Sequence, residues 1–216
     1  MKRHLFAIII GGVLVSTVSV AQNPPIEIDT SAMQAGAEPA NFTFWRTGQG
    51  ADGKWTVVAD PTAVKGHAIA QVSKDRTDYR FPLAVYQPFS GKNLEISVRF
   101  KPVAGTVDEA GGVAVRLLTP DNYYVARANA LEDNVRFYRV VKGRREQLAG
   151  ANTKVSANQW HTLALKVEGD RFTVSFDGKG VISAQDGTFL DAGKVALWTK
   201  ADSVTYFDTL SIAPLD

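Results

Sequence analysis

The sequence has 216 residues, no cysteine and a formal net charge of +2. This length suits one all-β domain, which routinely reaches roughly 200–250 residues and buries a sizeable core. Lys2 and Arg3 belong to a leader without acidic residues, so the remaining chain has 24 − 2 = 22 basic residues against 22 acidic ones. This balance excludes a nucleic-acid partner, which needs an excess of Lys and Arg. The lack of cysteine excludes a disulfide framework.

The first 21 residues have the pattern of a secretory signal peptide. Basic residues precede an apolar run over residues 5–15, and Ser19-Val20-Ala21 has the small residues of a cleavage site. The run is shorter than the roughly 20 residues that span a bilayer, so we expect no membrane span after cleavage. The sequence therefore predicts a bacterial protein exported to the periplasm or the medium. Residues 22–40 form a polar N-terminal lead, with one short strand over 26–29, and residues 41–216 form a single domain.

The body of the chain is predicted to consist of strands. Residues 54–59, 67–72 and 83–87 are the first of them, and Pro88 ends the third. Residues 92–102 alternate most clearly, with apolar side chains on one phase (Leu94, Ile96, Val98 and Phe100) and polar ones on the other (Glu95, Ser97, Arg99 and Lys101). Such a period of two indicates an antiparallel sheet with one buried face and one solvated face.

The centre of the chain, residues 111–150, contains three or four consecutive strands. Three of them are expected over residues 112–118, 123–130 and 135–141. Downstream, residues 160–184 read as a meander with tight turns at Gly169-Asp170 and Asp177-Gly178. Residues 193–199 and 204–212 are the last strands. Because no stretch after the leader has helical periodicity, the predicted fold is all-β, a two-sheet antiparallel sandwich or jelly roll.

Several motifs within residues 41–212 occur in an order that is typical of one superfamily. They are Gly53-Lys54-Trp55 with Asp60, and the stretches 111–127, 134–143, 159–178 and 204–212. This pattern resembles the concanavalin A-like lectin/glucanase superfamily, and within it laminin G-like and 3-keto-disaccharide-hydrolase-like (DUF1080) bacterial exported domains. The resemblance implies a concanavalin A-like jelly roll of two curved sheets, with glycan chemistry on the concave face in many members.

Five polar or aromatic side chains of the central strands are predicted to share one outward face. These candidate ligand-binding residues are Arg116, Tyr123, Arg127, Arg136 and Tyr138. Aromatic rings stack on sugars, and the guanidinium fork of arginine suits carboxylates and vicinal hydroxyls. The predicted partner is a carbohydrate or surface glycan. Two alternatives stay open: a solvated face held by cross-strand arginine–tyrosine pairs, and a face that docks a partner protein.

We find no complete catalytic constellation in the sequence. The glycoside-hydrolase-16 branch of the superfamily carries an E-x-D-x-x-E or E-x-D-x-E strand, which this chain lacks. The dipeptides Asp108-Glu109 and Glu132-Asp133 lie in predicted loops, whereas glycosidases need two carboxyl groups facing one bond, about 5–5.5 Å apart in retaining enzymes. The sequence therefore favours a non-catalytic domain. The alternative is a glycoside hydrolase-like enzyme that uses these acidic residues on a disaccharide or polysaccharide.

Asp208 is the candidate metal ligand. Phe207 and Leu210 lie an odd number of positions apart, so burying both requires the strand to change phase near Asp208. The carboxylate then either caps a turn or binds a structural calcium ion. No other cofactor is predicted.

The four tryptophans are the largest apolar side chains of the sequence. Large aromatic residues of β-sandwiches usually lie in the core, so Trp45, Trp55, Trp160 and Trp198 are expected there or at its rim. Trp45 and Trp55 flank the glycine-rich loop 48–53. For one of these two, a sugar-stacking platform at the rim is the alternative.

Overall fold

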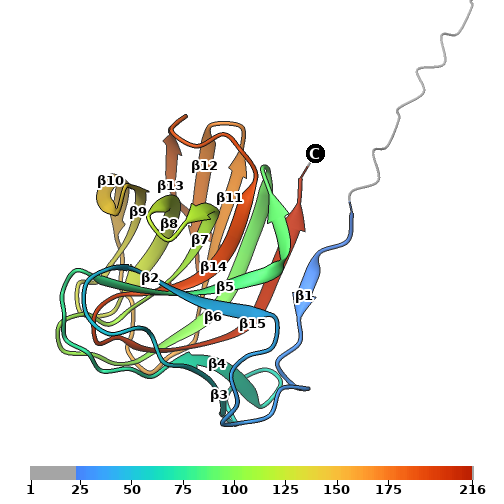
Figure 1. Cartoon of the computed structure of the whole chain (residues 1–216), viewed down its shortest axis with the longest axis vertical. Helices are drawn as coiled ribbons and strands as arrows, with labels where there is room; N and C mark the ends of the chain where they lie inside the picture. Colours follow the sequence, from blue (N-terminus) through green and yellow to red (C-terminus); the bar gives the residue numbers. More distant parts are fainter. Residues whose placement is uncertain (1–22, 216) are drawn as a thin grey trace, which may run out of the picture.

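The structure is a computed structural model that describes residues 23–215. Over this range it consists of strands, turns and loops, without a helix, and each strand pair is antiparallel. The strands form two sheets that pack against each other (Figure 1). This arrangement confirms the predicted jelly-roll sandwich. The predicted signal peptide, residues 1–21, lies outside the described residues.

The first sheet has eight strands. Seven follow the order β13-β12-β11-β6-β15-β4-β3, and β1 pairs with β15 beyond the end of β4. Their bounds are β1 Ile26–Ile28, β3 Trp55–Ala59, β4 His67–Gln71, β6 Leu94–Ala104, β11 His161–Glu168, β12 Arg171–Phe176, β13 Lys179–Gln185 and β15 Val204–Pro214. The meander predicted over residues 160–184 is thus confirmed as β11, β12 and β13.

The second sheet has seven strands in the order β10-β9-β8-β7-β14-β5-β2. Their bounds are β2 Phe42–Gly48, β5 Arg80–Gly91, β7 Ala110–Thr119, β8 Asn122–Asn129, β9 Asn134–Val141, β10 Arg144–Asn152 and β14 Gly193–Thr199. The central stretch of the sequence therefore forms four neighbouring strands, β7 to β10. This sheet carries all five candidate ligand-binding residues.

The main core lies between the two sheets. The apolar phase of β6, which includes Ile96 and Phe100, is fully buried there, and its polar phase faces outward. From the second sheet, Val113, Tyr124 and Phe137 meet it. Each side chain of this size contributes about 1.5–3 kcal/mol when it is fully buried. The period-two pattern of the sequence was therefore a correct guide to the core.

Strand β5 is longer than the sequence predicted. It starts before Pro82 and continues past Pro88 to Gly91, although proline donates no ladder hydrogen bond. Pro82 pairs with Arg46 on the edge strand β2, just beyond the last pairing of β5 with β14. Pro88 falls where the register between β5 and β14 shifts. Both prolines thus occupy positions where no neighbouring strand requires their N–H group.

The second sheet curls strongly toward the face that points away from the main core. Thr47 on β2 and Tyr123 on β8 share this face, and their hydroxyl oxygens lie 2.9 Å apart. The two strands are four positions apart, which in a flat sheet amounts to about 19 Å. The face is therefore concave, and Figure 1 shows β2 and β5 sweeping across the strands beneath them.

The concave face carries a second apolar cluster. Its buried members include Phe81, Leu83, Val125, Val140 and Trp198. The curl removes these side chains from water, because opposite edges of the sheet cover them. A ligand therefore has no access to these side chains, and only the rim of the concave face is open to solvent.

The N-terminal lead is attached to the first sheet. β1 pairs with the end of β15, from Ile26 opposite Ile212 to Ile28 opposite Leu210, and Ile28 is buried. The expected short strand therefore forms, and it lies at the edge of the sheet. No helix in the described part of the chain has the length and hydropathy to cross a membrane.

Candidate functional site

Four of the five candidate residues lie on the concave face. In the register of β8 and β9, Arg127 lies opposite Arg136, and Tyr138 lies opposite Val125, which belongs to the concave-face cluster. Tyr123 follows on the same phase of β8. The alternation of the sequence therefore assigned these side chains to one face correctly.

Arg116 lies on the other side of the sheet, so its assignment to the same face was wrong. β7 contains an irregularity between Val115 and Thr119, and Arg116 adopts a left-handed conformation there, with φ of 47°. The bulge reverses the phase, so the Arg116 side chain reaches toward β12, with its guanidinium carbon 5.6 Å from the centre of the Phe172 ring. Leu117 takes the concave side.

The buried guanidinium of Arg116 links loops at the edge of the sandwich. Its Nε donates to the carbonyl of Lys92 at 3.0 Å, and its terminal nitrogens donate to the carbonyls of Phe189, at 2.7 Å, and Gly169. Burial lowers the pKa of Arg116 below its usual value. All three donor nitrogens are occupied, so this arginine has a structural role.

The concave face is not the open surface that the sequence suggested. Tyr123 is 0% exposed, and its hydroxyl contacts Thr47 and the indole nitrogen of Trp198, at 2.9 and 3.3 Å. Burial raises the pKa of Tyr123 to about 12. The outward phase of β8 is covered because the sheet curls over it, which periodicity cannot show. A ligand therefore has no access to Tyr123 in this structure.

A polar cluster around Arg127 occupies one end of the concave face. The Arg127 guanidinium, 4% exposed, donates to the carboxylate of Glu132 at 2.8 Å, to the hydroxyl of Tyr138 at 3.1 Å and to the side-chain oxygen of Asn134. Its Nε is buried and has no hydrogen-bond partner within residues 23–215. Arg136, on the neighbouring strand, is directed away toward β10, where it donates to Ala151 and Asn152.

Lys200 and two aspartates complete this end of the face. The Lys200 ammonium lies 2.7 Å from carboxylate oxygens of both Asp78 and Asp108. Burial raises the pKa of Asp108, although the neighbouring Lys200 ammonium acts to lower it. For Lys200, burial acts to lower the pKa, but the carboxylates of Asp108 and Asp78 outweigh it, so the pKa of Lys200 is raised. For Glu132, burial is outweighed by Arg127 and Asn134, so its pKa is lowered. We call Asp78, Asp108, Arg127, Glu132, Tyr138 and Lys200 the Arg127 cluster.

The solvent side of the Arg127 cluster has unused hydrogen-bonding groups. One carboxylate oxygen of Glu132, Oε1, and one of Asp78, Oδ2, accept no hydrogen bond from the described residues. Both side chains are accessible, at 46% and 72%. The Lys200 ammonium has three N–H donors and contacts two carboxylates, those of Asp78 and Asp108. Two carboxylate oxygens thus face solvent beside Arg127, and the Lys200 ammonium, with its side chain 14% exposed, lies next to Asp78.

The acidic dipeptides lie in loops as predicted, and three of their four carboxyl groups, those of Asp108, Glu132 and Asp133, are engaged by neighbouring side chains. Asp108 is buried and accepts from Asn129 at 2.7 Å, besides its contact with Lys200. Asp133 pairs with Lys154 and accepts from a backbone N–H. Glu109 is buried without a charged partner, and burial raises its pKa.

Asp208 lies at the phase change that the sequence predicted. The register of β15 with β6 shifts between Asp208 and Ser211, Thr209 has φ of 47°, and Phe207 and Leu210 are both buried. Asp208 accepts from the backbone of Val64 at 2.8 Å and pairs with Arg99 at 3.1 Å. Among residues 23–215 no three His, Cys, Asp or Glu side chains gather in a metal-binding group.

Trp160 lies outside the core, so its expected place in the core or at its rim was wrong. It lies half-buried on the outer face of the eight-stranded sheet, above Arg99 and Lys101 at 4.8 and 5.0 Å, and its indole nitrogen donates to Thr62 at 2.9 Å. Its place before β11, in the polar phase of that strand, was the available signal. Trp55 and Trp198 are buried, as expected.

One protein family and one sequence relative match this chain. The family model of the galactocerebrosidase C-terminal lectin domain matches residues 93–215. A levanase of Bacillus subtilis (strain 168) is 34% identical over 68 residues, which is 32% of this chain and 10% of the levanase. The chain therefore corresponds to a small part of that enzyme.

Solved structures share the fold. The carbohydrate-binding module CBM66 of Bacillus subtilis superposes with a TM-score of 0.61 at 24% identity, over 80% of this chain and 97% of the module. The β-glucanase of Bacillus licheniformis gives a TM-score of 0.54 at 13% identity, over 84% and 95% of the two chains. The architecture is thus that of the concanavalin A-like superfamily, as the motifs indicated.

Proposed function

The chain belongs to the family of galactocerebrosidase C-terminal lectin domains, and we propose that it binds a glycan without cleaving it. The observation that carries this proposal is the Arg127 cluster. It presents two free carboxylate oxygens and an ammonium group at the end of the concave face, around an arginine that its neighbours hold rigidly. Neighbouring acceptors and donors of this kind suit the vicinal hydroxyls of a sugar.

The state of the carboxylates supports binding rather than hydrolysis. A glycosidase needs two carboxyl groups that reach the same bond from opposite sides. Asp108 is buried under Lys200 and Asn129, and one oxygen of Glu132 is occupied by Arg127 and Asn134. A carboxylate held by a guanidinium is a poor general acid, because its pKa is lowered.

We further propose that the protein is exported. The basic start, the short apolar run and the small residues before position 22 support a signal peptide. The absence of cysteine makes the fold independent of disulfide formation in that compartment. Fractionation of cells that express the full chain, with determination of the mature N-terminus, tests this part.

The glycan-binding test uses residues 22–216 and isothermal titration calorimetry with levan, β-glucan and galactose-terminated oligosaccharides. Glu132→Gln keeps the shape of the side chain and removes its charge. We expect it to weaken, at least tenfold, the affinity for the glycan of this panel that the unmodified protein binds. Glu168→Gln is the matched control. It also breaks an exposed ion pair, 2.8 Å from Lys166, but on the other sheet.

The two variants separate the outcomes. Affinity of Glu132→Gln within twofold of the unmodified protein would reject the Arg127 cluster as the site. Release of reducing sugar from the bound glycan, lost in Glu132→Gln, would show that the domain is an enzyme. Co-purification of one protein partner, with no binding to any glycan of the panel, would favour a protein-interaction module.

A further inference from the structure

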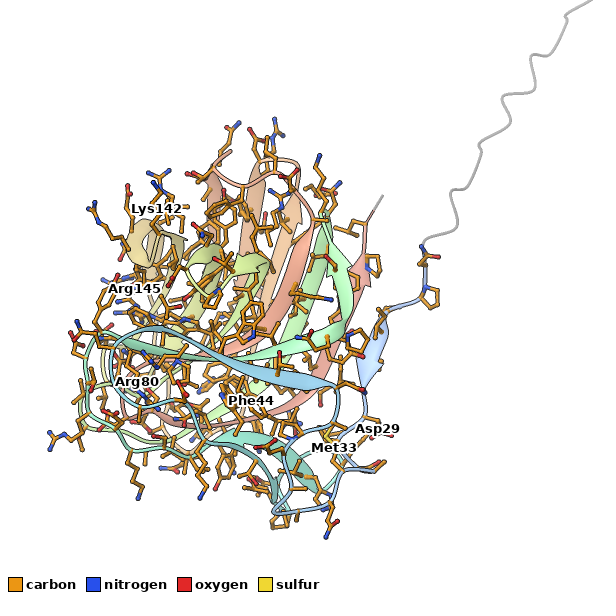
Figure 2. All side chains as sticks on the ribbon, viewed as in Figure 1. Asp29, Met33, Phe44, Arg80, Lys142 and Arg145 are labelled. Atoms are coloured by element: carbon orange, nitrogen blue, oxygen red, sulfur yellow. The ribbon has the colours of Figure 1, made fainter. Side chains whose placement is uncertain are left out.

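A basic hollow lies outside the Arg127 cluster, on the β9–β10 hairpin. It has a volume of about 530 Å³ and is lined by Arg139, Val141, Lys142, Arg144, Arg145, Glu146 and Thr188. Four of these seven residues are basic and one is acidic. Figure 2 shows Lys142 and Arg145 on the same flank of the molecule, where the hairpin lies. The chain after the leader has equal numbers of basic and acidic residues, so this concentration is a local feature.

Two acidic residues pair with a cation of the hollow, and both pair with Arg139. Its guanidinium pairs with Glu146 at 3.0 Å and with Asp186 at 2.8 Å. Asp186 is also engaged by the hydroxyl of Tyr124 at 2.6 Å. The Asp121 carboxylate lies beside Gly143 in the turn, so the four cations and three acidic groups of this region sum to +4 − 3 = +1.

Three cations of the hollow have no counter-ion. Lys142, Arg144 and Arg145 form no ion pair with the described residues, and one terminal nitrogen of Arg145 is buried without a hydrogen-bond partner. The Arg145 guanidinium itself lies against the rings of Phe81, Tyr138 and Trp198, on the concave side of the sheet. An anionic ligand would offset the mutual repulsion of Lys142, Arg144 and Arg145.

The backbone holds these cations in place. Lys142 and Gly143 both have positive φ, 49° and 74°, as a two-residue hairpin turn requires. The N–H of Gly143 donates to the carbonyl of Asp121 at 3.0 Å. The hydroxyl of Tyr79 donates to the carbonyl of Gly143 at 3.0 Å and accepts from the N–H of Arg145 at 2.7 Å. A turn fixed from two sides presents its charges with little loss of entropy on binding.

We propose that this hollow binds an anionic group, a carboxylate or a sulfate ester, of an acidic glycan. Arginine side chains bind both groups through paired N–H donors. The inference rests on the proposed glycan-binding function and adds the class of ligand. A long polyanion such as nucleic acid binds through a large excess of basic residues, whereas this chain has equal numbers of acidic and basic residues after the leader. The charge balance therefore favours a saccharide with isolated charges as the ligand.

The test compares a neutral galactan oligosaccharide with a uronate oligosaccharide and a sulfated galactan of the same length. Calorimetry is carried out at two salt concentrations. At least one acidic ligand is expected to bind at least tenfold more tightly than the neutral one, with an advantage that shrinks at higher salt. Titration at low pH, where a carboxylate is protonated and a sulfate ester is not, identifies the group.

The double variant Lys142→Gln/Arg144→Gln removes two exposed cations of the hollow. It is expected to abolish the advantage of the acidic ligand and to leave the affinity for the neutral one unchanged. The matched control is Arg171→Gln/Lys179→Gln, two exposed cations of β12 and β13. Circular dichroism verifies that each variant is folded.

Three results would overturn the inference: an acidic advantage that survives in the double variant, equal affinity for neutral and acidic ligands, or tighter binding to a short DNA duplex. Loss of binding to all glycans would instead reject the proposed function. Binding of neutral glycans that Glu132→Gln weakens, without an acidic advantage, would reject this inference alone.

Discussion

The guanidinium carbon of Arg145 lies 4.6 Å from the centre of the Phe81 ring, although the two residues belong to strands five positions apart in one sheet. Five strand spacings would separate them by about 24 Å in a flat sheet. The same guanidinium lies 4.4 Å from the ring of Tyr138 and 5.8 Å from that of Trp198. Arg145 thus covers the aromatic side chains of the concave face and connects opposite edges of the curl.

Replacing Arg145 is therefore expected to destabilise the protein. Arg145→Gln removes contacts with three aromatic rings, each worth about 0.5–1 kcal/mol, so the free energy of unfolding measured in urea should fall by about 1.5–3 kcal/mol. Arg144→Gln, an exposed neighbour, is the control and should change the free energy of unfolding by less than about 0.5 kcal/mol. Equal stability of the two variants would contradict the bridging role.

Arg116→Met is expected to destabilise the fold and to leave glycan binding intact. The change leaves the carbonyls of Lys92, Phe189 and Gly169 without their buried donor, which should lower the free energy of unfolding by about 2–4 kcal/mol. Urea denaturation measures the loss, and calorimetry at a temperature where the variant is folded measures the affinity. A folded Arg116→Met protein with weakened glycan binding would return Arg116 to the site.

Two of the six tyrosines should resist ionisation. Burial raises the pKa of Tyr123 and of Tyr124 to about 12 in the folded protein. Unfolded tyrosine ionises near pH 10, so between about pH 10 and 12 the folded state retains protons that the unfolded state has lost. Stability should therefore fall as the pH rises through this window, by about 1.4 kcal/mol per pH unit for each residue.

Spectrophotometric titration measures this effect. Two phenol groups should ionise near pH 12 or on unfolding, and one late group should disappear in Tyr123→Phe. Ionisation of all six tyrosines with midpoints near pH 10 in the folded protein would contradict the burial of this pair.

Asp202 should govern the stability of the folded chain in acid. Burial acts to raise its pKa, but the hydroxyl of Thr106 and three backbone N–H groups outweigh it, so the pKa lies below its usual value of 3.8. The stabilisation is fully present above pH about 4 and is lost as the pH falls through the lowered pKa. Stability measured from pH 6 to pH 2 should therefore decline.

The variant Asp202→Asn tests this assignment. It should unfold about 2–4 kcal/mol more easily at pH 7, because hydrogen bonds to a charged group contribute about 1.5–3 kcal/mol each. The difference from the unmodified protein should shrink toward pH 2. Asp191→Asn, at an exposed position, is the control. A difference that is constant across this range would rule out titration of Asp202 as its cause.

Calcium is expected to have little effect on stability. Both oxygens of Asp208 already accept hydrogen bonds, from Thr209, Val64 and the Arg99 guanidinium, and the charge of that guanidinium repels a cation. The melting temperature with 5 mM CaCl₂ should match that with EDTA within about 1 °C, because only a bound ligand shifts it. A rise of several degrees, absent in Asp208→Asn, would establish the calcium site.

Much of the site could be predicted because alternation along a strand is local. The phase of β8 and β9 correctly grouped Tyr123, Arg127, Arg136 and Tyr138 on one face, opposite Tyr124 and Phe137 in the core. The same rule failed at Arg116. A single residue in a left-handed conformation reversed the phase of β7, and no residue type such as glycine marked the position in the sequence.

The groups that complete the Arg127 cluster could not be predicted from the strands. Asp78 and Lys200 lie in loops separated by more than a hundred residues, and neither belongs to a motif. They meet Asp108 because β14 lies beside both β5 and β7 in the sheet. This order is a property of the topology and leaves no periodic signal.

The sequence by itself determined the all-β class, the alternation that builds the core and the residue types that face away from it, because these depend on neighbours along one strand. Only the tertiary structure decided which of those residues a ligand can reach. The curl of the seven-stranded sheet brings Thr47 to Tyr123 and Arg145 to Phe81, and so turns an expected open surface into a second core. The contacts between distant strands bury it, which leaves hydrogen-bonding groups only at the rim.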